Sequence, residues 1–83
     1  MTAHEQMLLA ANLLSIVKGR DEISASELFA VLERAGSTHP INTIHAEMLR
    51  CCINCPRENE TPHDYFKRVD HDKYRLIKKL DLF

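Results

Sequence analysis

Helix-breaking residues divide this chain into short segments, and that division limits the folds open to it more than any other feature. Gly19, Gly36 and Pro40 separate three stretches in which apolar residues recur at spacings of three and four, as on one face of a helix. Pro56 then precedes a charged C-terminal stretch. The 83 residues are few enough for one domain, residues 1–83, and a hydrophobic fraction of 45% is that of a folded protein.

The first two helices are bounded by local signals. The first is expected from Ala3 to Lys18, where Gly19 can adopt the positive φ that often ends a helix. The start of the second helix is marked by Ser24 and Glu27, which have the spacing of a capping box. In a capping box each side chain accepts a hydrogen bond from the backbone N–H of the other residue. Gly36 is expected to end this second helix.

A third helix is expected after Pro40, which is tolerated in a first turn but not in a helix interior. Asn42 and Pro40 are nearly equal candidates for its start, and Pro56 is the expected stop. Its apolar side includes Ile44 and Met48. The residues expected on the opposite side are Thr43, Ala46, Glu47 and Arg50.

The C-terminal part of the chain has the pattern of a hairpin. Residues 57–64 form a polar loop, with one helical turn possible at Thr61 and Pro62. Two strands are predicted at 65–69 and 73–77, joined by an Asp-His-Asp turn at 70–72. Tyr74 and Leu76 alternate with charged residues, as in a half-buried strand. Phe66 and Val69 are out of phase, which either a bulge or a late strand start would correct.

The order of these elements predicts a mainly α protein with a small antiparallel β-hairpin, arranged as a winged helix-turn-helix of three helices plus a wing. The stretches "NTIHAEMLRCC" and "FKRVDHDKYRLI" resemble winged-helix domains attached to bacterial restriction endonucleases and related defence proteins. In that family the second stretch follows the pattern F-x-R-V-x-x-x-x-Y-x-L, although its turn commonly contains a glycine that this chain lacks. The resemblance implies a DNA-binding fold with no enzyme attached.

Duplex DNA is therefore the first predicted partner. A small, mixed polar helix face fits the major groove, where Arg50 could donate to guanine and Glu47 could accept from cytosine. Cations on the hairpin would contact phosphates, which supply salt-dependent affinity. The predicted DNA-binding residues are Asn42, Thr43, Ala46, Glu47, Arg50, Lys67, Arg68, Lys73 and Arg75. A formal net charge of −1 and the acidic Asp70 and Asp72 leave an alternative: the same fold used to bind a protein.

No catalytic, metal or cofactor site is predicted. Cys52-x-x-Cys55 with His63 or His71 has zinc-ligand types, but the second half of such a site lacks paired ligands, so reduced thiols in the core are the expectation. Cys51 fits the same description. The histidines are scattered, and the chain contains no glycine-rich phosphate loop, so no enzyme is predicted.

The first helix carries more apolar residues than a small core requires. They surround much of its circumference and comprise Met7, Leu8, Leu9, Leu13, Leu14, Ile16 and Val17. Such a surplus favours a homodimer through this helix, and the alternative is that the C-terminal "LIKKLDLF" folds back over it. The longest apolar run, residues 7–17, is too short to span a bilayer, so we expect a cytoplasmic protein with no membrane partner.

Overall fold

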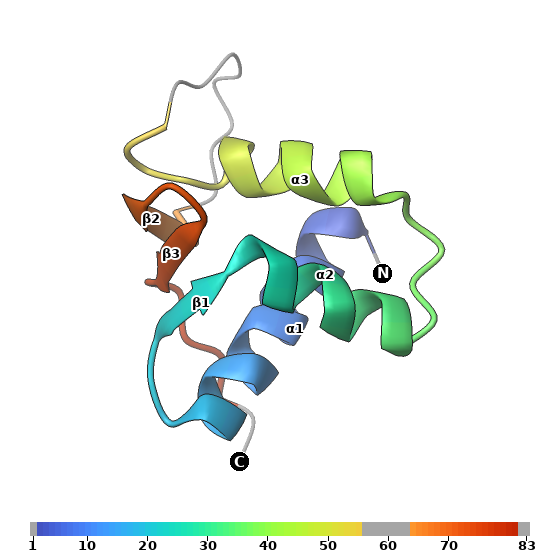
Figure 1. Ribbon diagram of the computed structural model, residues 1–83, viewed down its shortest axis with the longest axis horizontal. Coiled ribbons are helices and arrows are strands. Elements are labelled where there is room, and N and C mark those ends of the chain that lie inside the picture. Colours follow the sequence, from blue (N-terminus) through green and yellow to red (C-terminus); the bar gives the residue numbers. More distant parts are fainter. Residues whose placement is uncertain (1, 56–63, 82–83) are drawn as a thin grey trace.

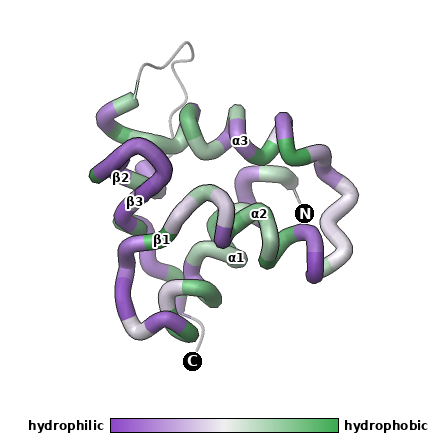
Figure 2. Tube along the Cα trace, viewed as in Figure 1, coloured by the Kyte–Doolittle hydropathy of each residue, from purple (hydrophilic) through white to green (hydrophobic). Residues whose placement is uncertain are grey.

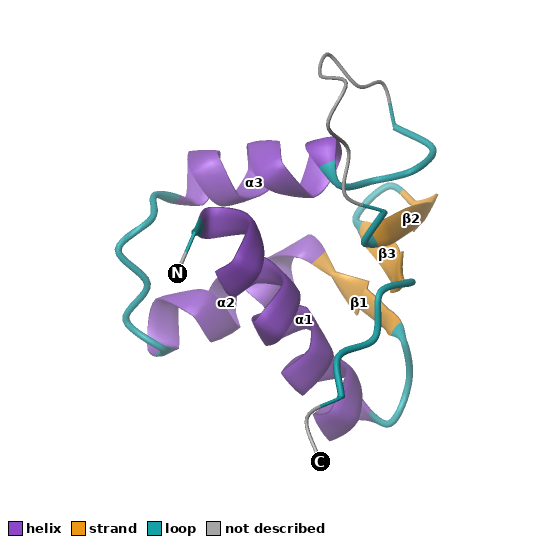
Figure 3. Cartoon of the chain, turned by 180° about the vertical axis from the view of Figure 1, so that it is seen from behind, coloured by secondary structure: helices purple, strands orange, loops and turns teal. Residues whose placement is uncertain are grey.

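The protein, seen in a computed structural model, has three helices and a three-stranded antiparallel sheet (Figure 1). The structure describes residues 2–55 and 64–81. The elements along the chain are α1 (Ala3–Lys18), β1 (Glu22–Ser24), α2 (Ala25–Arg34), α3 (Ile41–Arg50), β2 (Phe66–Asp70) and β3 (Lys73–Leu76). The sheet lies at one end of the helical layer, beside the C-terminal end of α3 and the N-terminal end of α2 (Figures 1 and 3).

Local capping explains where the first two helices begin and end. The predicted capping box of α2 is confirmed: the Ser24 hydroxyl accepts from the Glu27 N–H at 3.0 Å, and the Ser24 N–H donates to the Glu27 carboxylate at 3.0 Å. Thr2 and Glu5 form a second capping box at the start of α1. Gly19 follows α1 with a φ of 71°, a left-handed conformation that glycine adopts without steric cost.

The third helix begins directly after Pro40, at one of the two predicted starts, and ends earlier than predicted. Pro40 is its N-cap, so Asn42 lies inside the first turn and does not cap it. The helix ends at Arg50, before the predicted stop at Pro56, because the Cys51 carbonyl accepts hydrogen bonds from the backbone N–H groups of residues 65 and 66 at 3.1 Å. The three cysteines therefore follow α3 in a turn that runs beside the sheet.

The predicted hairpin is confirmed, but it is part of a larger sheet. The strand order is β1-β3-β2, so β3 lies in the centre and pairs with β1 as well as with β2. The β1 strand lies directly before α2, and its pairing with β3 makes the fold less purely helical than the predicted three helices plus a hairpin. The register shifts between Arg68 and Asp70, which places a bulge at Val69 and explains the broken alternation.

The core lies where the helices meet the inner face of the sheet. Phe66 and Tyr74 are fully buried there, with their ring centroids 6.2 Å apart in an edge-to-face contact. Ile44 and Met48 of α3 reach the same core, as predicted. Figure 2 shows hydrophobic residues on all three helices and hydrophilic residues along most of the β2–β3 hairpin. The hairpin therefore contributes a few buried side chains and a largely polar outer surface.

The C-terminal segment folds back onto α1 but leaves part of its apolar face uncovered. The buried Asn12 side chain accepts from the Leu80 N–H at 3.0 Å and donates to the Lys78 carbonyl at 3.2 Å. Among the described residues, Leu13, Ile16 and Val17 remain 44%, 49% and 83% exposed. Leu82, Phe83, His63 and the helical turn predicted at Thr61 and Pro62 lie outside the described residues.

None of the helices in the described part of the chain combines the length and apolarity needed to cross a membrane.

Candidate nucleic-acid interface

The outward side of α3 combines three short side chains with the exposed Ile41 and His45. Asn42, Thr43 and Ala46 are exposed, while Ile44 and Met48 on the opposite side are buried, so the predicted inward and outward sides are correct at these positions. A helix surface made of an amide, a hydroxyl and a methyl group is narrow enough to approach another surface closely. It carries no charge of its own along this stretch.

Glu47 and Arg50 are paired with each other on the flank of α3. An Arg50 Nη1 atom lies 3.0 Å from Glu47 Oε1, one helical turn away. The Glu47 side chain is only 18% exposed, against 47% for Arg50. The two formal charges cancel locally, so this flank offers an external anion less attraction than an uncompensated arginine would. Glu47 is also too enclosed to serve freely as an acceptor.

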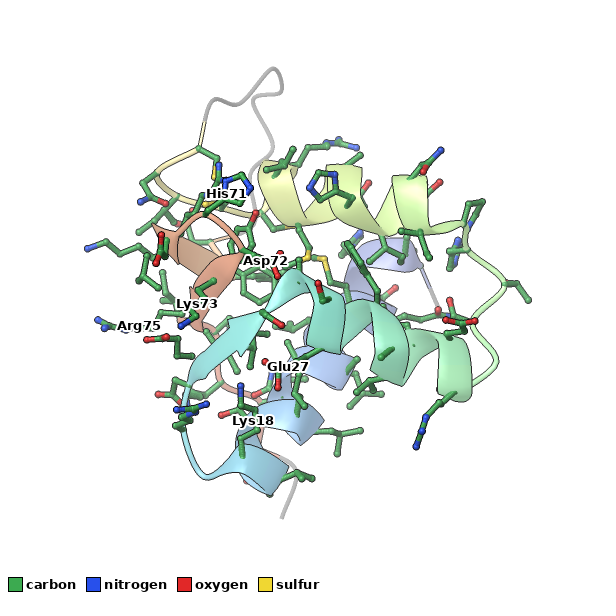
Figure 4. All side chains as sticks on the ribbon, viewed as in Figure 1. Lys18, Glu27, His71, Asp72, Lys73 and Arg75 are labelled. Atoms are coloured by element: carbon green, nitrogen blue, oxygen red, sulfur yellow. The ribbon has the colours of Figure 1, made fainter. Side chains whose placement is uncertain are left out.

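Three of the predicted hairpin cations share the outer face of the sheet, which we define as the side opposite Tyr74 and Leu76. Lys67 and Arg75 are Cα partners across β2 and β3, and Lys73 lies two residues from Arg75, so alternation places all three on one side. Figure 4 shows Lys73 and Arg75 both pointing away from the helices. Like charges directly opposite one another weaken strand pairing, so this arrangement contributes little to folding.

Glu22 and Asp70 are the acidic residues of this outer face. Asp70 is the Cα partner of Lys73 across β2 and β3. Glu22 is the Cα partner of Arg75 on the β1 side, and the Glu22 carboxylate lies 3.9 Å from the Lys73 ammonium. Both side chains of that pair are largely exposed, so the ion pair is weak and easily exchanged for another anion. Lys67 and Arg75 have no ion-pair partner among residues 2–55 and 64–81.

Arg68 is placed differently from the other predicted cations. Its guanidinium donates to the carbonyls of Asp70 at 3.3 Å and His71 at 2.7 Å, both within its own hairpin. Its backbone N–H and carbonyl are both bonded to the Asn54 side chain at 2.8 Å. Arg68 therefore braces the hairpin turn, and the structure does not bring it into the outer-face group.

The two acidic residues of the turn are both exposed and make different contacts. The Asp72 carbonyl accepts from the Ala25 N–H at 3.1 Å, and its carboxylate accepts from the Ser26 hydroxyl at 3.1 Å, which places it at the N-terminal end of α2 (Figure 4). Asp70 accepts from the His71 N–H at 2.7 Å. Asp72 is thus turned toward α2 and away from the cations of the outer face.

The α3 helix and the hairpin adjoin at one end only. The Cys51 carbonyl, directly after Arg50, is bonded to the start of β2, so the C-terminal end of α3 is tied to the sheet. Asn42 lies eight residues before Arg50, which on a helix is about 12 Å along the axis. The predicted site residues therefore form two neighbouring surfaces, the outward side of α3 and the outer face of the sheet, joined near Arg50.

The cysteines are buried thiols, as predicted, and Cys52 and Cys55 lie side by side. Burial, together with hydrogen bonding to Cys52, raises the pKa of Cys55 to about 11. Within the described segments, no three histidine, cysteine or acidic side chains converge in a way that could hold a metal ion.

Some contacts near the interface were not predicted. His45 is exposed on α3 and packs its ring edge-on against Phe29 of α2, with 6.1 Å between the ring centroids. Asn54 was not singled out, because nothing in a polar turn signals that its side chain will pair with a strand 14 residues away. The contact between Ser26 and Asp72 spans 46 residues and has no local signal either.

Comparison with protein-family models, curated proteins and solved structures found no match to this chain.

Proposed function

We propose that this protein is a non-enzymatic winged-helix protein that binds double-stranded DNA, acting as a small transcriptional regulator or as an accessory of a defence system. The order of helices and strands and the antiparallel sheet are compatible with a winged-helix layout, in which β2 and β3 are the wing. The sequence resemblance to winged-helix domains of restriction endonucleases points in the same direction.

In this mode of binding α3 lies in the major groove and the hairpin follows the adjacent backbone. The short side chains of Asn42, Thr43 and Ala46 allow the helix to approach base edges closely. Lys67, Lys73 and Arg75 contact phosphates, which position the protein and supply most of the affinity. Arg50 contributes once its pairing with Glu47 is exchanged for a contact with DNA, and Arg68 supports the wing from within.

The observation that carries this proposal is the distribution of charge on the hairpin. Its cations on the outer face lack strong partners among the described residues, whereas Asp72 at its tip is directed toward α2. An acidic tip would repel phosphate if it faced the DNA. With Asp72 held at α2, the outer face carries Lys67, Lys73 and Arg75 against Glu22 and Asp70, an excess of one positive charge.

Duplex binding measured by fluorescence anisotropy tests this function. We expect a random-sequence duplex to bind weakly, with affinity falling steeply between about 50 and 200 mM salt, and the Lys67→Ala/Arg75→Ala variant to lose most of it. Arg34→Ala is the matched control, because Arg34 is an exposed cation in the last turn of α2, at the end of that helix away from the sheet. An absence of salt-dependent binding at the lowest salt would refute DNA binding.

Protein binding is the second candidate, and the exposed side of α1 is the observation that favours it. Leu13, Ile16 and Val17 lie on one side of α1 and remain exposed, which suits a homodimer or another protein partner. Light scattering during size-exclusion chromatography tests the dimer: we expect Val17→Glu to convert it to monomer and Val69→Glu, a matched change on the hairpin, to leave it intact. A wild-type protein that is monomeric at every concentration would exclude the dimer.

A further inference from the structure

Two of the three cysteines form a close pair in the turn that follows α3. The sulfur atoms of Cys52 and Cys55 are 2.7 Å apart, and Cys55 donates to Cys52. Cys52 is fully buried, and Cys55 retains 9% exposure. The third cysteine, Cys51, occupies the position directly after α3 and is also buried. The turn thus brings two thiols within the reach needed to form a bond between them.

A hollow beside the hairpin gives a small molecule access to this pair. It has a volume of about 320 Å³ and is open to solvent. Cys55 lies in its wall with Asn54 from the same turn, and the hairpin supplies the rest of the wall, including Arg68 and His71. Cys55 is therefore the thiol that an external reagent reaches first, and Cys52 lies behind it.

Hydrogen bonds connect the same pair to the hairpin. The Cys52 thiol donates to the Asn54 side-chain oxygen at 3.0 Å. That side chain bonds both backbone groups of Arg68 at 2.8 Å, in the manner of one strand pairing with another. Arg68 in turn donates to the His71 carbonyl at 2.7 Å. A change at the thiols is thus transmitted to the edge of β2 and to the hairpin turn through three consecutive contacts.

We propose that Cys52 and Cys55 are a site of thiol–disulfide exchange, and that the disulfide formed there removes the Cys52 S–H donor to Asn54 and so weakens the hold of Asn54 on the edge of β2. The co-reactant is a low-molecular-weight disulfide. The Cys55 thiolate attacks one of its sulfurs, forming a mixed disulfide and releasing one thiolate. The Cys52 thiolate then attacks the Cys55 sulfur and releases the second. The protein loses two electrons and two protons, and the reagent is reduced to two thiols.

The environment of the pair sets its rate of reaction. Burial raises the pKa of Cys55 to about 11, so roughly one molecule in ten thousand carries its thiolate at pH 7. Because the thiolate is the attacking species, exchange is slow at neutral pH and accelerates about tenfold per pH unit up to that pKa. The pair would therefore remain reduced during brief exposure to oxidant and respond to sustained exposure.

Oxidation of the full-length chain by oxidised glutathione tests the site. We expect the folded protein to lose two of its three titratable thiols. Cys51→Ala should still form the bond, since it retains both partners, whereas Cys55→Ala and Cys55→Ser should not. Intact mass and alkylation by a maleimide report the bond. A folded Cys51→Ala variant that stays reduced while its urea-unfolded form oxidises would overturn the assignment. Disulfide formation in the two Cys55 variants to the same extent as in Cys51→Ala would also overturn it.

Hydrogen exchange of the backbone amides tests the connection to the hairpin. The Arg68 N–H donates to Asn54, which loses its hydrogen bond from the Cys52 thiol on oxidation, so exchange of the Arg68 amide should quicken several-fold in the oxidised protein, and more than that of amides in α2. A disulfide that forms but leaves the Arg68 amide exchanging at the same rate as in the reduced protein would overturn this connection. Neither measurement involves DNA, so their outcome is independent of whether the protein binds a duplex.

Discussion

The cations around the C-terminal end of α1 and those on the outer face of the sheet differ in what they contact. Near α1, the Lys18 ammonium lies 2.7 Å from the Glu27 carboxylate (Figure 4) and also donates to the Glu22 carbonyl at 3.1 Å. Lys79 is paired with Asp21. On the sheet, Lys67 and Arg75 face each other with no ion-pair partner among the described residues. The first group stabilises the fold, and the second is available to bind an external anion.

Duplex affinity should separate the two groups most strongly. Each lost phosphate contact costs about eightfold in affinity at 0.1 M salt, so Lys67→Ala/Arg75→Ala should weaken binding roughly 60-fold. The melting temperature of this double variant should stay the same as that of the wild type or rise slightly, because two like charges have been removed from opposite positions on β2 and β3. Anisotropy and thermal unfolding check both expectations. A large fall in melting temperature would show that these cations are structural and would remove the distinction.

Replacing the paired Lys18 should have the opposite profile. Lys18→Met removes the ammonium from Glu27, and we expect a loss of about 0.5–1 kcal/mol in the free energy of unfolding, or about 4 °C in melting temperature, with duplex affinity unchanged. Chemical denaturation measures the first quantity. If this variant binds DNA as poorly as the outer-face double variant does, the cations act through overall charge and not through position.

The same pair should give a defined pH dependence. The hydrogen bond from Lys18, and then that from the Ser24 N–H, lowers the pKa of Glu27 below its ordinary value of 4.5. A carboxyl whose pKa is lowered by folding contributes stability above its unfolded pKa and loses it as pH falls through the folded pKa. The stability difference between wild type and Lys18→Met should therefore shrink on acidification below about pH 4.5. A difference that stays constant to pH 2 would mean that Lys18 acts through packing alone.

The flank of α3 that carries Glu47 and Arg50 is intermediate between the two groups of cations, because Arg50 is ion-paired and yet lies near the sheet. Glu47→Ala removes the carboxylate that lies 3.0 Å from Arg50 and should tighten duplex binding between about two- and eightfold, which is at most one further phosphate contact. In the double variant Glu47→Ala/Arg50→Ala the gain should disappear. A gain that persists without Arg50 would trace to the removal of a negative charge alone and would place Arg50 outside the interface.

The smallest expected effect concerns the acidic turn. Asp72→Asn removes a negative charge from the N-terminal end of α2 but keeps an oxygen for the Ser26 hydroxyl, so we expect a loss of about 0.3–0.5 kcal/mol in unfolding free energy. Asp70→Asn is the matched control within the same turn and should cost less. Equal losses at the two positions would show that the turn, and not its contact with α2, is the source of the stabilisation.

The sequence was most informative where a structural rule acts over a few residues. The capping box of Ser24 and Glu27 and the stop at Gly19 need only their own neighbours, and both are confirmed. The broken alternation between Phe66 and Val69 also indicated a bulge as one of two solutions, and the register contains it.

Features decided by distant partners could not be read in the same way. The end of α3 at Arg50 depends on hydrogen bonds from residues 65 and 66 to the Cys51 carbonyl, and these groups are distant from Cys51 in the sequence. Arg68 and Arg75 are the same residue type in one hairpin, yet one braces the turn and the other faces outward. Their difference follows from register, from the bulge and from Asn54, and each of these requires the assembled sheet.

The most direct test of this division of the cations is an NMR titration of the isotope-labelled protein with a short duplex. The amides and side chains of Lys67, Lys73 and Arg75, with those on the outward side of α3, should show the largest shift changes. Lys18, Arg34 and Lys79 should show little change. Shift changes concentrated on α1, or spread evenly over all the cations, would contradict the assignment of the outer face as the nucleic-acid contact.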